Sequence, residues 1–549
     1  MSTIAELLLA REQDDHIGFI HEDGRWSFRQ VLDEARRRAA LFEQLNDPGR
    51  PPHIGVLLDN TPDYLFWLAG AALAGSVVVG INSTYRGEPL AQLIEHTDCQ
   101  LLVMSSTHAH LLDGIESPVP ADRLVLVDSP DHADRLAALT PYTGPREPRS
   151  EEDLYLLVFT SGSTGLPKAV RCTQGRLARS GAHVATIAEL NREAGDVVYA
   201  PLPLFHAASL FTGWSATLNA AIPFATRSRF SASRTAADIR GYGATVLTYT
   251  GKVLNYILAV PEQADDAELP LRLAIGNEAS EQDIKTFARR YGCAVRDSYG
   301  STEGVIIIRR DASMPAGSLG LAADSVKVLH PETAKECPRV ERDDQGRITN
   351  LEAATGEIVE TEPTSGFEGY YRNEAAARER FRDGAYWSGD LAYRDADGWF
   401  FFAGRSNEWL RVDGENFAAA PVEAIVGRHP DVRSVAIYAV PDDPVGDRVM
   451  AAVELRDGAT LDPAAFDQFL GSQPDLGPKW LPAFVRVDAE LPKLSSMKLD
   501  KRRLRREAWT VDGVLWRPGK GQALRPLDAD DRAALDPLLG DLTRGRSRA

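Results

Sequence analysis

The chain has 549 residues, which exceeds what one hydrophobic core can organise and predicts roughly three or four structural units. Hydrophobic residues make up 44% of the sequence and charged residues 26%, as in ordinary globular proteins. The 61 basic and 79 acidic residues give a formal net charge of -18, which argues against a protein that holds nucleic acid over a broad face. A local basic pocket for a nucleotide is compatible with this charge.

The cysteines and the first residues of the chain indicate a reducing compartment. The four cysteines are Cys99, Cys172, Cys293 and Cys337. They form no CxxC pair, and the sequence does not have the two Cys/His pairs that a zinc site requires. We therefore interpret them as reduced thiols. The N-terminal text MSTIAELLLAREQDDH lacks the basic start and long apolar core of a signal peptide, so we expect a cytoplasmic protein.

An uncharged stretch, Tyr64 to Ile81, is open to two interpretations. Its length is near the minimum for a membrane-spanning helix. The alternative is a buried helix, a turn at Gly75 and Ser76, and a buried strand from Val77 to Gly80. We expect the second arrangement because glycines interrupt the stretch and β-branched residues follow them. Peripheral contact with a membrane is left open.

Short apolar runs alternate with helical patterns through about residue 300, which predicts mostly parallel sheets covered by helices. The runs expected to be strands are Ile54–Leu58, Val77–Gly80, Leu101–Met104, Leu124–Val127, Val197–Ala200, Ala221–Ala225, Thr245–Tyr249, Leu271–Ile275 and Ala294–Ser298. The segment from Asp128 to Ser150 is rich in Pro, Asp and Arg, so we expect a surface connection there. Short strands with Gly and Asp turns predict a β-rich subdomain over 315–403, and a smaller unit follows Arg405.

The most informative segment is Leu156 to Lys168, LLVFTSGSTGLPK, in which an apolar strand leads into a loop of hydroxyls and glycines. Hydroxyls and backbone N–H groups bind polyphosphate, glycines let the backbone come close, and lysine adds positive charge. The spacing is not that of a Walker A loop. A flexible surface turn, the alternative, leaves the preceding buried strand unexplained. The candidate phosphate-binding residues are Thr160, Ser161, Gly162, Ser163, Thr164, Gly165 and Lys168.

The loop TSGSTGLPK resembles the signature of the adenylate-forming (ANL) superfamily, which includes acyl-CoA synthetases, luciferases and nonribosomal-peptide adenylation domains. The resemblance implies ATP and Mg2+ as cofactors, with Thr164 near the metal. It implies an α/β fold: residues 1–406 would form a large domain of layered, mostly parallel sheets with the β-rich subdomain. Residues 407–549 would form a small α+β lid, hinged at Asn407, two residues after Arg405.

A second segment, Asp297 to Gly304 (DSYGSTEG), resembles the family's nucleotide-binding stretch. By that resemblance Tyr299 would stack on the adenine, with Gly300 beside it. Thr302 would contact the α-phosphate, and Glu303 would help hold Mg2+. The residue types suit these roles, because an aromatic face fits a base and a carboxylate fits a hard cation. The alternative is a loop with a capping glutamate.

A third segment, Tyr386 to Leu391 (YWSGDL), resembles the stretch whose aspartate accepts hydrogen bonds from both ribose hydroxyls, here Asp390. Arg405 would add a contact to the ribose or a phosphate. The residues of LRLAIGNE that the resemblance assigns to the nucleotide site are Gly276, Asn277 and Glu278. Glu278 replaces the glycine that is more usual in the family.

A fourth segment, Leu491 to Lys501 (LPKLSSMKLDK), resembles the stretch that carries the family's adenylation lysine. Aligned on Pro492, that lysine is Lys498, which would bridge the substrate carboxylate and the α-phosphate as charge develops. Lys493 and Lys501 are the alternatives within the segment. The alternative without a catalytic role is that Lys498 is a solvated lysine in the basic run KLDKRRLRR.

Several phrases, among them LRLAIGNE, LRVDGENF and LWRPGKGQALRPL, are similar to the fatty-acid-transport-protein and very-long-chain acyl-CoA synthetase branch. Bacterial enzymes acting on long-chain fatty acids or steroid side-chain acids look most similar. The resemblance places Gly251 and Gly276 along the acyl pocket and Gly414 by the pantetheine channel. It places His206 near the substrate carboxylate and the CoA channel; the alternative is a core histidine.

The resemblance implies an acid–thiol ligase that forms an acyl-adenylate from ATP and a lipophilic acid, releases pyrophosphate, and then forms acyl-CoA and AMP. Its substrates would be the acid, ATP and coenzyme A. Two alternatives remain. One is an adenylate-forming ligase that transfers the acyl group to a carrier-protein thiol. The other is a lipid-binding or transport protein with a weak ligase site.

Overall fold

The computed structural model divides the chain into two compact units. The first unit comprises Met1–Ile307 and Thr364–Glu379, and the second comprises Ile308–Pro363 and Arg380–Ala549. The structure describes residues 2–85, 87–115, 118–144, 149–160, 167–250, 253–310, 314–315, 317–344, 348–363, 366–405, 409–412, 415–441, 447–473, 476–477, 479–493, 499–519 and 521–543. The predicted boundary between residues 406 and 407 lies outside these ranges and stays a prediction.

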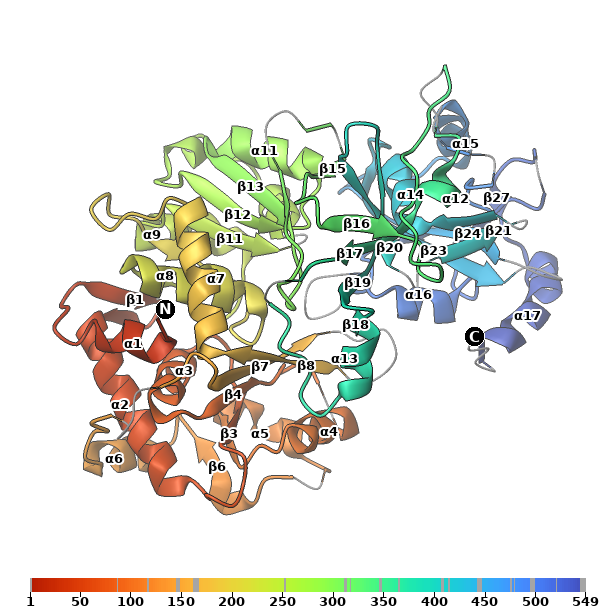
Figure 1. Cartoon of the computed structure of the whole chain (residues 1–549). Helices are drawn as coiled ribbons and strands as arrows, with labels where there is room; N and C mark the ends of the chain where they lie inside the picture. Colours follow the sequence, from red (N-terminus) through yellow and green to blue (C-terminus); the bar gives the residue numbers. More distant parts are fainter. Residues whose placement is uncertain are drawn as a thin grey trace. The chain divides into compact units, whose positions relative to one another are not determined.

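The first unit is built on two mostly parallel sheets with helices around them (Figure 1). One sheet has the order β6-β5-β3-β4-β7-β8, and only its last pair, β7 and β8, is antiparallel. Its strands are β3 (His53–Leu57), β4 (Val77–Gly80), β5 (Leu101–Met104), β6 (Leu124–Leu126), β7 (Leu154–Thr160) and β8 (Lys168–Thr173). The alternation of helical and apolar runs therefore predicted this layer correctly.

The other sheet of the first unit contains the order β13-β12-β11-β9-β10-β1-β2, parallel except for the hairpin of β1 and β2. Its strands are β1 (Ile17–His21), β2 (Gly24–Ser27), β9 (Val198–Tyr199), β10 (Phe224–Ala225), β11 (Val246–Thr250), β12 (Leu273–Asn277) and β13 (Ala294–Tyr299). All nine predicted strands are present, with bounds shifted by a few residues. Parallel pairing places the carboxyl ends of β11, β12 and β13 at one edge.

Helices of the first unit cover these sheets. They are α1 (Ile4–Leu9), α2 (Phe28–Leu45), α3 (Pro62–Ala74), α4 (Glu88–His96), α5 (Ser106–Ala109), α6 (Pro130–Ala138), α7 (Gln174–Ile187), α8 (Ser215–Ala220), α9 (Thr235–Tyr242), α10 (Val253–Ala259) and α11 (Glu281–Tyr291). A π-helix, Ser209–Trp214, precedes α8, and α13 (Glu374–Arg380) lies at the boundary of the two units. The segment predicted as a surface connection contains α6, which begins where Ser129 caps it and Pro130 occupies its first turn.

The uncharged stretch forms α3 and β4, with Gly75 in the left-handed conformation between them. From Tyr64 to Ala74 every residue of α3 is buried, and α3 packs against α2 so closely that a Cβ on Gly70 would lie 2.8 Å from the Ala35 carbonyl oxygen. A helix that is apolar on all sides is thus enclosed by protein. Among the described residues, no helix is long and apolar enough to cross a membrane.

The second unit contains an antiparallel sheet followed by a smaller α+β part. The antiparallel sheet has the order β15-β20-β19-β17-β16 and confirms the predicted β-rich subdomain. Its strands are β15 (Ser318–Gly320), β16 (Val326–Leu329), β17 (Gly356–Glu360), β19 (Ala385–Arg394) and β20 (Phe400–Arg405), with β14 (Ile308–Arg309) before it, α12 (Leu351–Ala354) between β16 and β17, and β18 (Phe381–Arg382) paired to β19.

The smaller part is a sheet of order β23-β24-β25-β26-β27 with helices. Its elements are β23 (Val432–Pro441), β24 (Asp447–Leu455), β25 (Phe484–Asp488), β26 (Leu515–Trp516), β27 (Arg525–Pro526), α14 (Ala419–Val426), α15 (Pro463–Ser472), α16 (Lys501–Glu507) and α17 (Ala529–Thr543), preceded by the hairpin β21 (Trp409–Val412) and β22 (Glu415–Ala418). The helix and strand signals after Arg405 predicted a smaller part built of both, and the structure has helices and strands here.

Replacing Gly181 by alanine should separate α7 from α8. A Cβ on Gly181 would lie 2.1 Å from the Ser215 side-chain oxygen and 2.6 Å from the Ser215 carbonyl oxygen. Because both residues are buried, we expect the free energy of unfolding to fall by about 1–3 kcal/mol and the Tm to fall with it. The matched control is Gly241→Ala in α9, where a Cβ would meet nothing within 4 Å. Equal melting temperatures for the two variants would contradict the predicted strain.

Candidate functional site

The predicted phosphate loop connects the two strands of an antiparallel hairpin. Strand β7 ends at Thr160, β8 begins at Lys168, and these two residues pair across the hairpin. The apolar strand before the loop is therefore confirmed. The loop residues Ser161, Gly162, Ser163, Thr164 and Gly165 lie outside the described residues. Lys168 emerges from the hairpin with only 12% of its side chain exposed.

A second segment of the chain lies alongside β8 and extends the hairpin. The Arg171 N–H donates to the Gly369 carbonyl at 3.1 Å, and the Tyr371 N–H donates to the Ala169 carbonyl at 2.8 Å. Val170 and Tyr370 form an antiparallel bridge between the two segments. This pairing brings Tyr370, just over two hundred residues later in the sequence, next to Lys168.

Tyr370 contacts both charged residues that the sequence assigned to the nucleotide site. Its hydroxyl donates a hydrogen bond of 2.8 Å to the Glu303 carboxylate, and the Lys168 ammonium lies 5.4 Å from the centre of its ring. Glu303 is 8% exposed and Tyr370 is buried. Lys168 also lies 3.7 Å from Glu379. Tyr370 was missed in the sequence, where its only signal is an aromatic pair after Gly369.

Arg176 is a second residue of this region that the sequence did not indicate. Its side chain is buried, and it donates to the Arg171 carbonyl at 2.7 Å and to the Thr302 carbonyl. The guanidinium also lies 5.6 Å from the centre of the Phe211 ring. Arg176 thus ties β8 to the segment containing Thr302 and Glu303. In the sequence Arg176 is a single arginine in a helical pattern, and such a pattern is equally typical of an arginine exposed to solvent.

The predicted nucleotide residues Gly276, Asn277, Tyr299 and Gly300 gather where strands β12 and β13 end. Gly276 is required by close packing, since a Cβ there would lie 2.1 Å from the Tyr249 carbonyl oxygen on β11. Behind this edge the buried carboxylate of Asp297 accepts hydrogen bonds from the Tyr249 hydroxyl at 2.9 Å and from the Ala279 N–H at 3.0 Å. Figure 1 shows β11, β12 and β13 side by side.

Glu278 follows this edge with an unusual backbone. Its φ is +64°, in the left-handed region that favours glycine. A glycine would adopt this conformation without strain, whereas Glu278 adopts it at some cost in backbone strain. The side chain is exposed at the edge of the sheet.

His206 stands at the end of the turn Pro203–His206, before the π-helix. Its N–H donates to the Pro203 carbonyl at 3.0 Å, and its ring centroid lies 4.6 Å from that of Phe205. The side chain is half-buried, and Phe205 is buried. The predicted substrate residue Gly251, which would follow β11, lies outside the described residues.

In the second unit, Asp390 on β19 pairs with Arg405 on β20. The structure describes the main chain of Arg405, whose backbone position is adjacent to that of Asp390 across the sheet. The buried carboxylate of Glu357 lies beside this pair and accepts a hydrogen bond from the Gly389 N–H. Burial raises the pKa of Glu357, and the neighbouring Asp390 charge adds to the rise, while the Gly389 N–H and two arginines oppose it.

The remaining predicted residues of this unit are Asn407, Gly414 and Lys498, and all three lie outside the described residues. The two alternatives to Lys498 are described, and each forms an ion pair. Lys493 lies 2.6 Å from Glu490, and Lys501 lies 2.9 Å from Glu423. Both lysines therefore have carboxylate partners within the small part of the unit.

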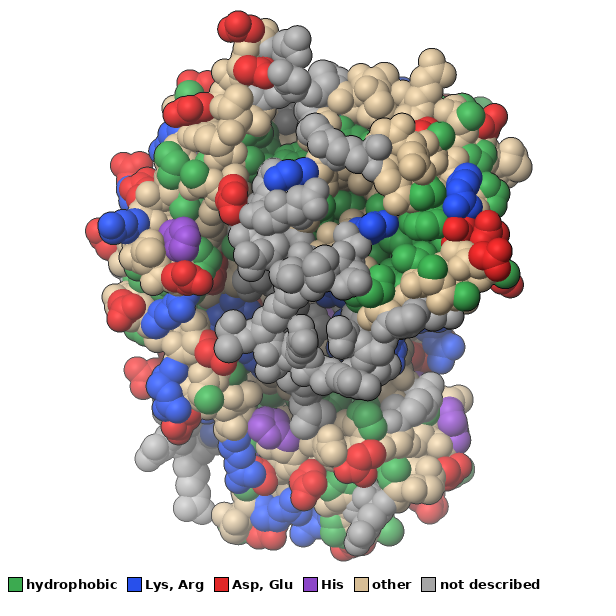
Figure 2. All heavy atoms as spheres, turned by 90° about the vertical axis from the view of Figure 1, so that its right-hand side faces the viewer, with side chains coloured by type: hydrophobic (Ala, Val, Ile, Leu, Met, Phe, Trp, Pro, Cys, Tyr) green, Lys and Arg blue, Asp and Glu red, His purple; other side chains and the backbone are tan. Residues whose placement is uncertain are grey.

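Metal-binding groups and surface charge also bear on the site. The described residues contain no cluster of three or more His, Cys, Asp or Glu side chains that could hold a metal ion. Mg2+ is commonly bound through one or two carboxylates together with substrate phosphates, so Glu303 alone fits it as a protein ligand. On the face drawn in Figure 2, basic and acidic side chains are interspersed and hydrophobic side chains gather in places, as on a solvated protein surface.

Comparisons with known proteins agree with the predicted superfamily. The model of the AMP-binding enzyme family matches residues 9–371, and that of the AMP-binding enzyme C-terminal domain matches residues 421–498. The steroid-22-oyl-CoA synthetase of Rhodococcus jostii is 43% identical over 551 aligned residues, covering 100% of this chain and 98% of the relative. The medium/long-chain-fatty-acid–CoA ligase FadD17 of Mycobacterium tuberculosis is 42% identical, covering 94% and 98%.

A solved structure supports the fold. The anthranilate CoA ligase AuaEII, crystallised with anthranoyl-AMP, superposes with a TM-score of 0.79 at 19% identity, covering 92% of this chain and 97% of that one. At this identity the likeness supports the fold alone. The predicted fold class, with its layered sheets and its small C-terminal part, is confirmed.

Replacing Glu357 by glutamine should stabilise the protein more as the pH rises. Folding raises the pKa of Glu357, so the folded state favours the protonated carboxyl group. The ionised carboxylate therefore destabilises the folded state increasingly as the pH rises toward the raised pKa. Glutamine keeps an acceptor for the Gly389 N–H and does not ionise. We expect the Tm of Glu357→Gln, relative to the parent protein, to be higher near pH 8 than near pH 4.

The control for this measurement is Glu362→Gln, an exposed glutamate at the end of the same segment. Its Tm difference from the parent should change little between the two pH values. A difference for Glu357→Gln that is constant, or that falls as the pH rises, would contradict the assigned direction of the pKa shift.

Proposed function

Because the chain belongs to the AMP-binding enzyme family, we propose that it is an ATP-dependent acyl-CoA ligase that activates a lipophilic carboxylic acid. In the first reaction a carboxylate oxygen attacks the α-phosphorus of ATP and pyrophosphate leaves. A carboxylate is a poor electrophile, and the acyl-adenylate supplies the leaving group that it lacks. In the second reaction the CoA thiolate attacks the acyl carbon and AMP leaves.

The observation that carries the proposal is the convergence of Lys168 and Glu303 on Tyr370. A positive charge at the mouth of the β7–β8 hairpin and a carboxylate beside it suit a triphosphate together with its cation. Mg2+, when bound, would neutralise charge on the phosphate oxygens. The buried hydrogen bond from Tyr370 holds the Glu303 carboxylate in place before the nucleotide arrives, so little reorganisation is needed.

The other nucleotide contacts are assigned by the same proposal. Tyr299 would stack on the adenine, and the neighbouring main chain of Gly276–Glu278 would contact the nucleotide. The parallel register of β12 with β13, which pairs Asn277 with Ser298, supports a shared site for these residues. Thr302 would meet the α-phosphate, with its main chain held by Arg176. Asp390 and Arg405 would bind the ribose, and their neighbouring backbone positions on β19 and β20 agree with a shared target.

The two reactions need different groups at one site, so we propose a lid that changes position between them. Residues 1–406 would bind ATP and the acid, and residues 407–549 would form the lid, hinged at Asn407. Lys498 would act in adenylation, and Gly414 would border the pantetheine channel after the lid has moved. His206 and Gly251 would face the acyl group. Gating of this kind is a common role for a hinge.

The substrate class follows from the relatives. One is named steroid-22-oyl-CoA synthetase and the other medium/long-chain-fatty-acid–CoA ligase, and each aligns with almost the whole of this chain. We propose an acid of one of these two kinds. A reducing, cytoplasmic location is also proposed, and the four cysteines support it because all are buried free thiols.

The direct test is a pyrophosphate-release screen with ATP, Mg2+ and a panel of fatty acids and steroid side-chain acids. We expect release with at least one lipophilic acid and transfer of its acyl group to free CoA. Release followed by transfer only to a carrier-protein thiol would favour that alternative acceptor. Absence of pyrophosphate release and of AMP formation with every acid would overturn the proposal.

The magnesium role of Glu303 predicts a shifted metal requirement. Glu303→Gln should raise the Mg2+ concentration needed for half-maximal pyrophosphate release because it removes the carboxylate charge. Tyr370→Phe should raise it in the same direction by about 10-fold, since it removes only the hydrogen bond that orients the carboxylate. The matched control is Tyr371→Phe, because the hydroxyl of Tyr371 donates to Asp98 and not to Glu303. A Mg2+ titration that is unchanged in Glu303→Gln would refute the assigned role.

The lid lysine predicts a separation of the two half-reactions. Lys498→Ala should abolish acyl-adenylate formation yet largely spare thioester formation from supplied acyl-AMP, because the lysine stabilises charge only in the first step. Lys493→Ala and Lys501→Ala serve as controls, since both lysines have carboxylate partners. Equal loss of both half-reactions in Lys498→Ala, or a selective loss in either control, would count against the assignment.

A further inference from the structure

The main chain just before His206 is held by a side chain from the other sheet of the first unit. We propose that Asn60 is a positioning residue for His206: its amide fixes the turn Leu202–Leu204 and so sets where the histidine stands. This inference rests on the proposed function, in which His206 faces the acyl group. Asn60 follows β3 and precedes α3, far from His206 in the sequence, and it is 3% exposed.

The amide of Asn60 contacts both sides of Pro203. Its nitrogen donates to the Leu202 carbonyl at 2.8 Å, and its oxygen accepts from the Leu204 N–H at 2.7 Å. Proline has no N–H of its own, so this turn has one donor fewer with which to hold itself together. A single planar amide that donates to one residue and accepts from the other fixes the direction of the chain through the turn.

Two more hydrogen bonds hold the same turn, and both fix the main chain close to His206. The Ser209 hydroxyl donates to the Leu202 carbonyl at 2.7 Å, and the His206 N–H donates to the Pro203 carbonyl at 3.0 Å. Phe205 packs against the end of β4 so closely that a Cβ on Gly80 would lie 2.9 Å from the Phe205 Cα. The histidine therefore stands on a turn whose backbone has little freedom.

Asn60 is itself anchored from the opposite side. Its side-chain nitrogen also donates to the Thr226 hydroxyl oxygen at 3.2 Å, and Thr226 donates onward to the Ala200 carbonyl at 2.7 Å. Its own N–H donates to the Ser228 carbonyl at 3.2 Å. The amide is thus oriented by groups that do not belong to the turn.

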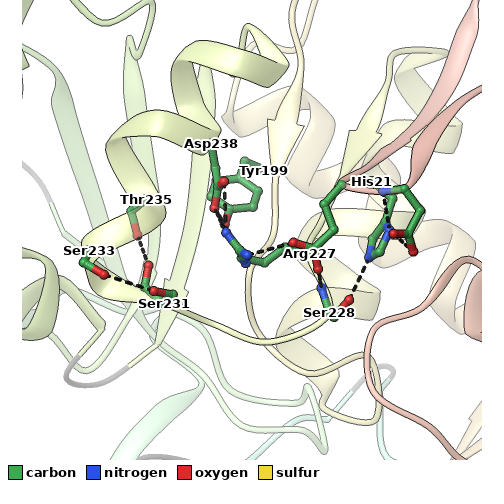
Figure 3. A network of polar contacts seen from close by, with 10 residues as sticks. His21, Tyr199, Arg227, Ser228, Ser231, Ser233, Thr235 and Asp238 are labelled. Atoms are coloured by element: carbon green, nitrogen blue, oxygen red, sulfur yellow. Dashed lines mark hydrogen bonds and ion pairs between the residues drawn. The ribbon is translucent and has the colours of Figure 1, made fainter.

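Ser228 belongs to the polar network drawn in Figure 3. Its N–H donates to Glu22 at 3.1 Å, and the adjacent Arg227 bonds both to Glu22 and to the buried Asp238, each at 2.7 Å. Tyr199 donates to Asp238 as well, at 2.8 Å. Charge-assisted bonds on this scale hold the segment after β10 rigidly and give Asn60 a fixed support.

His21 and Asp23 extend this network beyond Ser228. The Nε2 atom of His21 lies 3.4 Å from the Ser228 hydroxyl. Its Nδ1 atom lies 3.1 Å from the Asp23 carboxylate and 3.2 Å from the Asp23 backbone nitrogen. Burial lowers the pKa of this histidine. These contacts add to the support of the segment after β10.

The inference is tested with Asn60→Ala and a matched control. Asn60→Ala leaves the Leu202 carbonyl and the Leu204 N–H without the amide and frees the turn. The control, Thr226→Val, removes a hydrogen bond of Asn60 and a bond to Ala200 but leaves the amide on the turn. We expect Asn60→Ala to slow acyl transfer from acyl-AMP to CoA by roughly 10- to 100-fold, and Thr226→Val to slow it much less.

A double-mutant cycle separates positioning from general destabilisation. Acyl transfer is measured for Asn60→Ala, His206→Ala and the double variant, at a temperature well below the Tm of each. If Asn60 acts through His206, the double variant should be no slower than His206→Ala alone. Asn60→Asp, which keeps the acceptor for the Leu204 N–H but loses the donor, should fall between the parent and Asn60→Ala and serves if alanine prevents folding.

The outcomes separate the positioning role of Asn60 from the proposed ligase function. Independent, multiplicative losses in the double variant, or equal losses in Asn60→Ala and Thr226→Val, would overturn the positioning role while the ligase activity stands. Unchanged transfer in His206→Ala would overturn both the role of the histidine and this inference. Absence of any adenylation by the parent protein would instead overturn the proposed function.

Discussion

The pairing of residues 369–371 with strand β8 determines where Lys168 and Glu303 of the first unit meet. Without it, Lys168 would stand at the end of a hairpin and Glu303 in a loop more than a hundred residues later. The backbone hydrogen bonds of this pairing place one aromatic ring between them, with its hydroxyl toward the carboxylate and its face toward the ammonium. A cation over an aromatic face and a phenol donating to a carboxylate are both favourable contacts.

Because Glu303 is buried, its stability depends on the groups that it contacts. A carboxylate removed from water costs free energy unless hydrogen bonds or positive charge compensate for it. Glu303 has the Tyr370 hydroxyl as one such compensating donor, and its main-chain neighbourhood is held by the buried Arg176. A polyanionic nucleotide with its cation would satisfy both the lysine and the carboxylate. A group that is already oriented when the substrate binds loses little energy in reorganisation.

The two parallel sheets of the first unit contribute different things to the site. The sheet ending in β7 and β8 supplies the hairpin of the predicted phosphate loop, while the carboxyl ends of β11, β12 and β13 supply the predicted adenine side. Asn60 follows β3 of one sheet, and its amide contacts the turn after β9 and Thr226 after β10 of the other sheet. Buried polar groups of this kind fix one geometry, because any displacement leaves a donor or an acceptor unpaired.

Local sequence predicted the strands, the buried helix–turn–strand stretch and the apolar strand before the predicted phosphate loop, because each depends on residues within one short segment. The apolar runs placed nine strands to within a few residues, and the glycine at position 75 marked the turn after α3. The helix α6 was missed, since proline in a polar segment reads as a connection although Pro130 here occupies a first helical turn.

The sequence by itself determined the family, through a loop of nine residues whose hydroxyls, glycines and lysine suit a polyphosphate whatever surrounds them. Tertiary structure alone decided what Tyr370, Arg176 and Asn60 contact. Tyrosine, arginine and asparagine occur in every kind of environment, and nothing in their immediate neighbours shows what they contact. Their partners lie far away in the chain and are reached only when strand pairing and buried packing close the intervening loops.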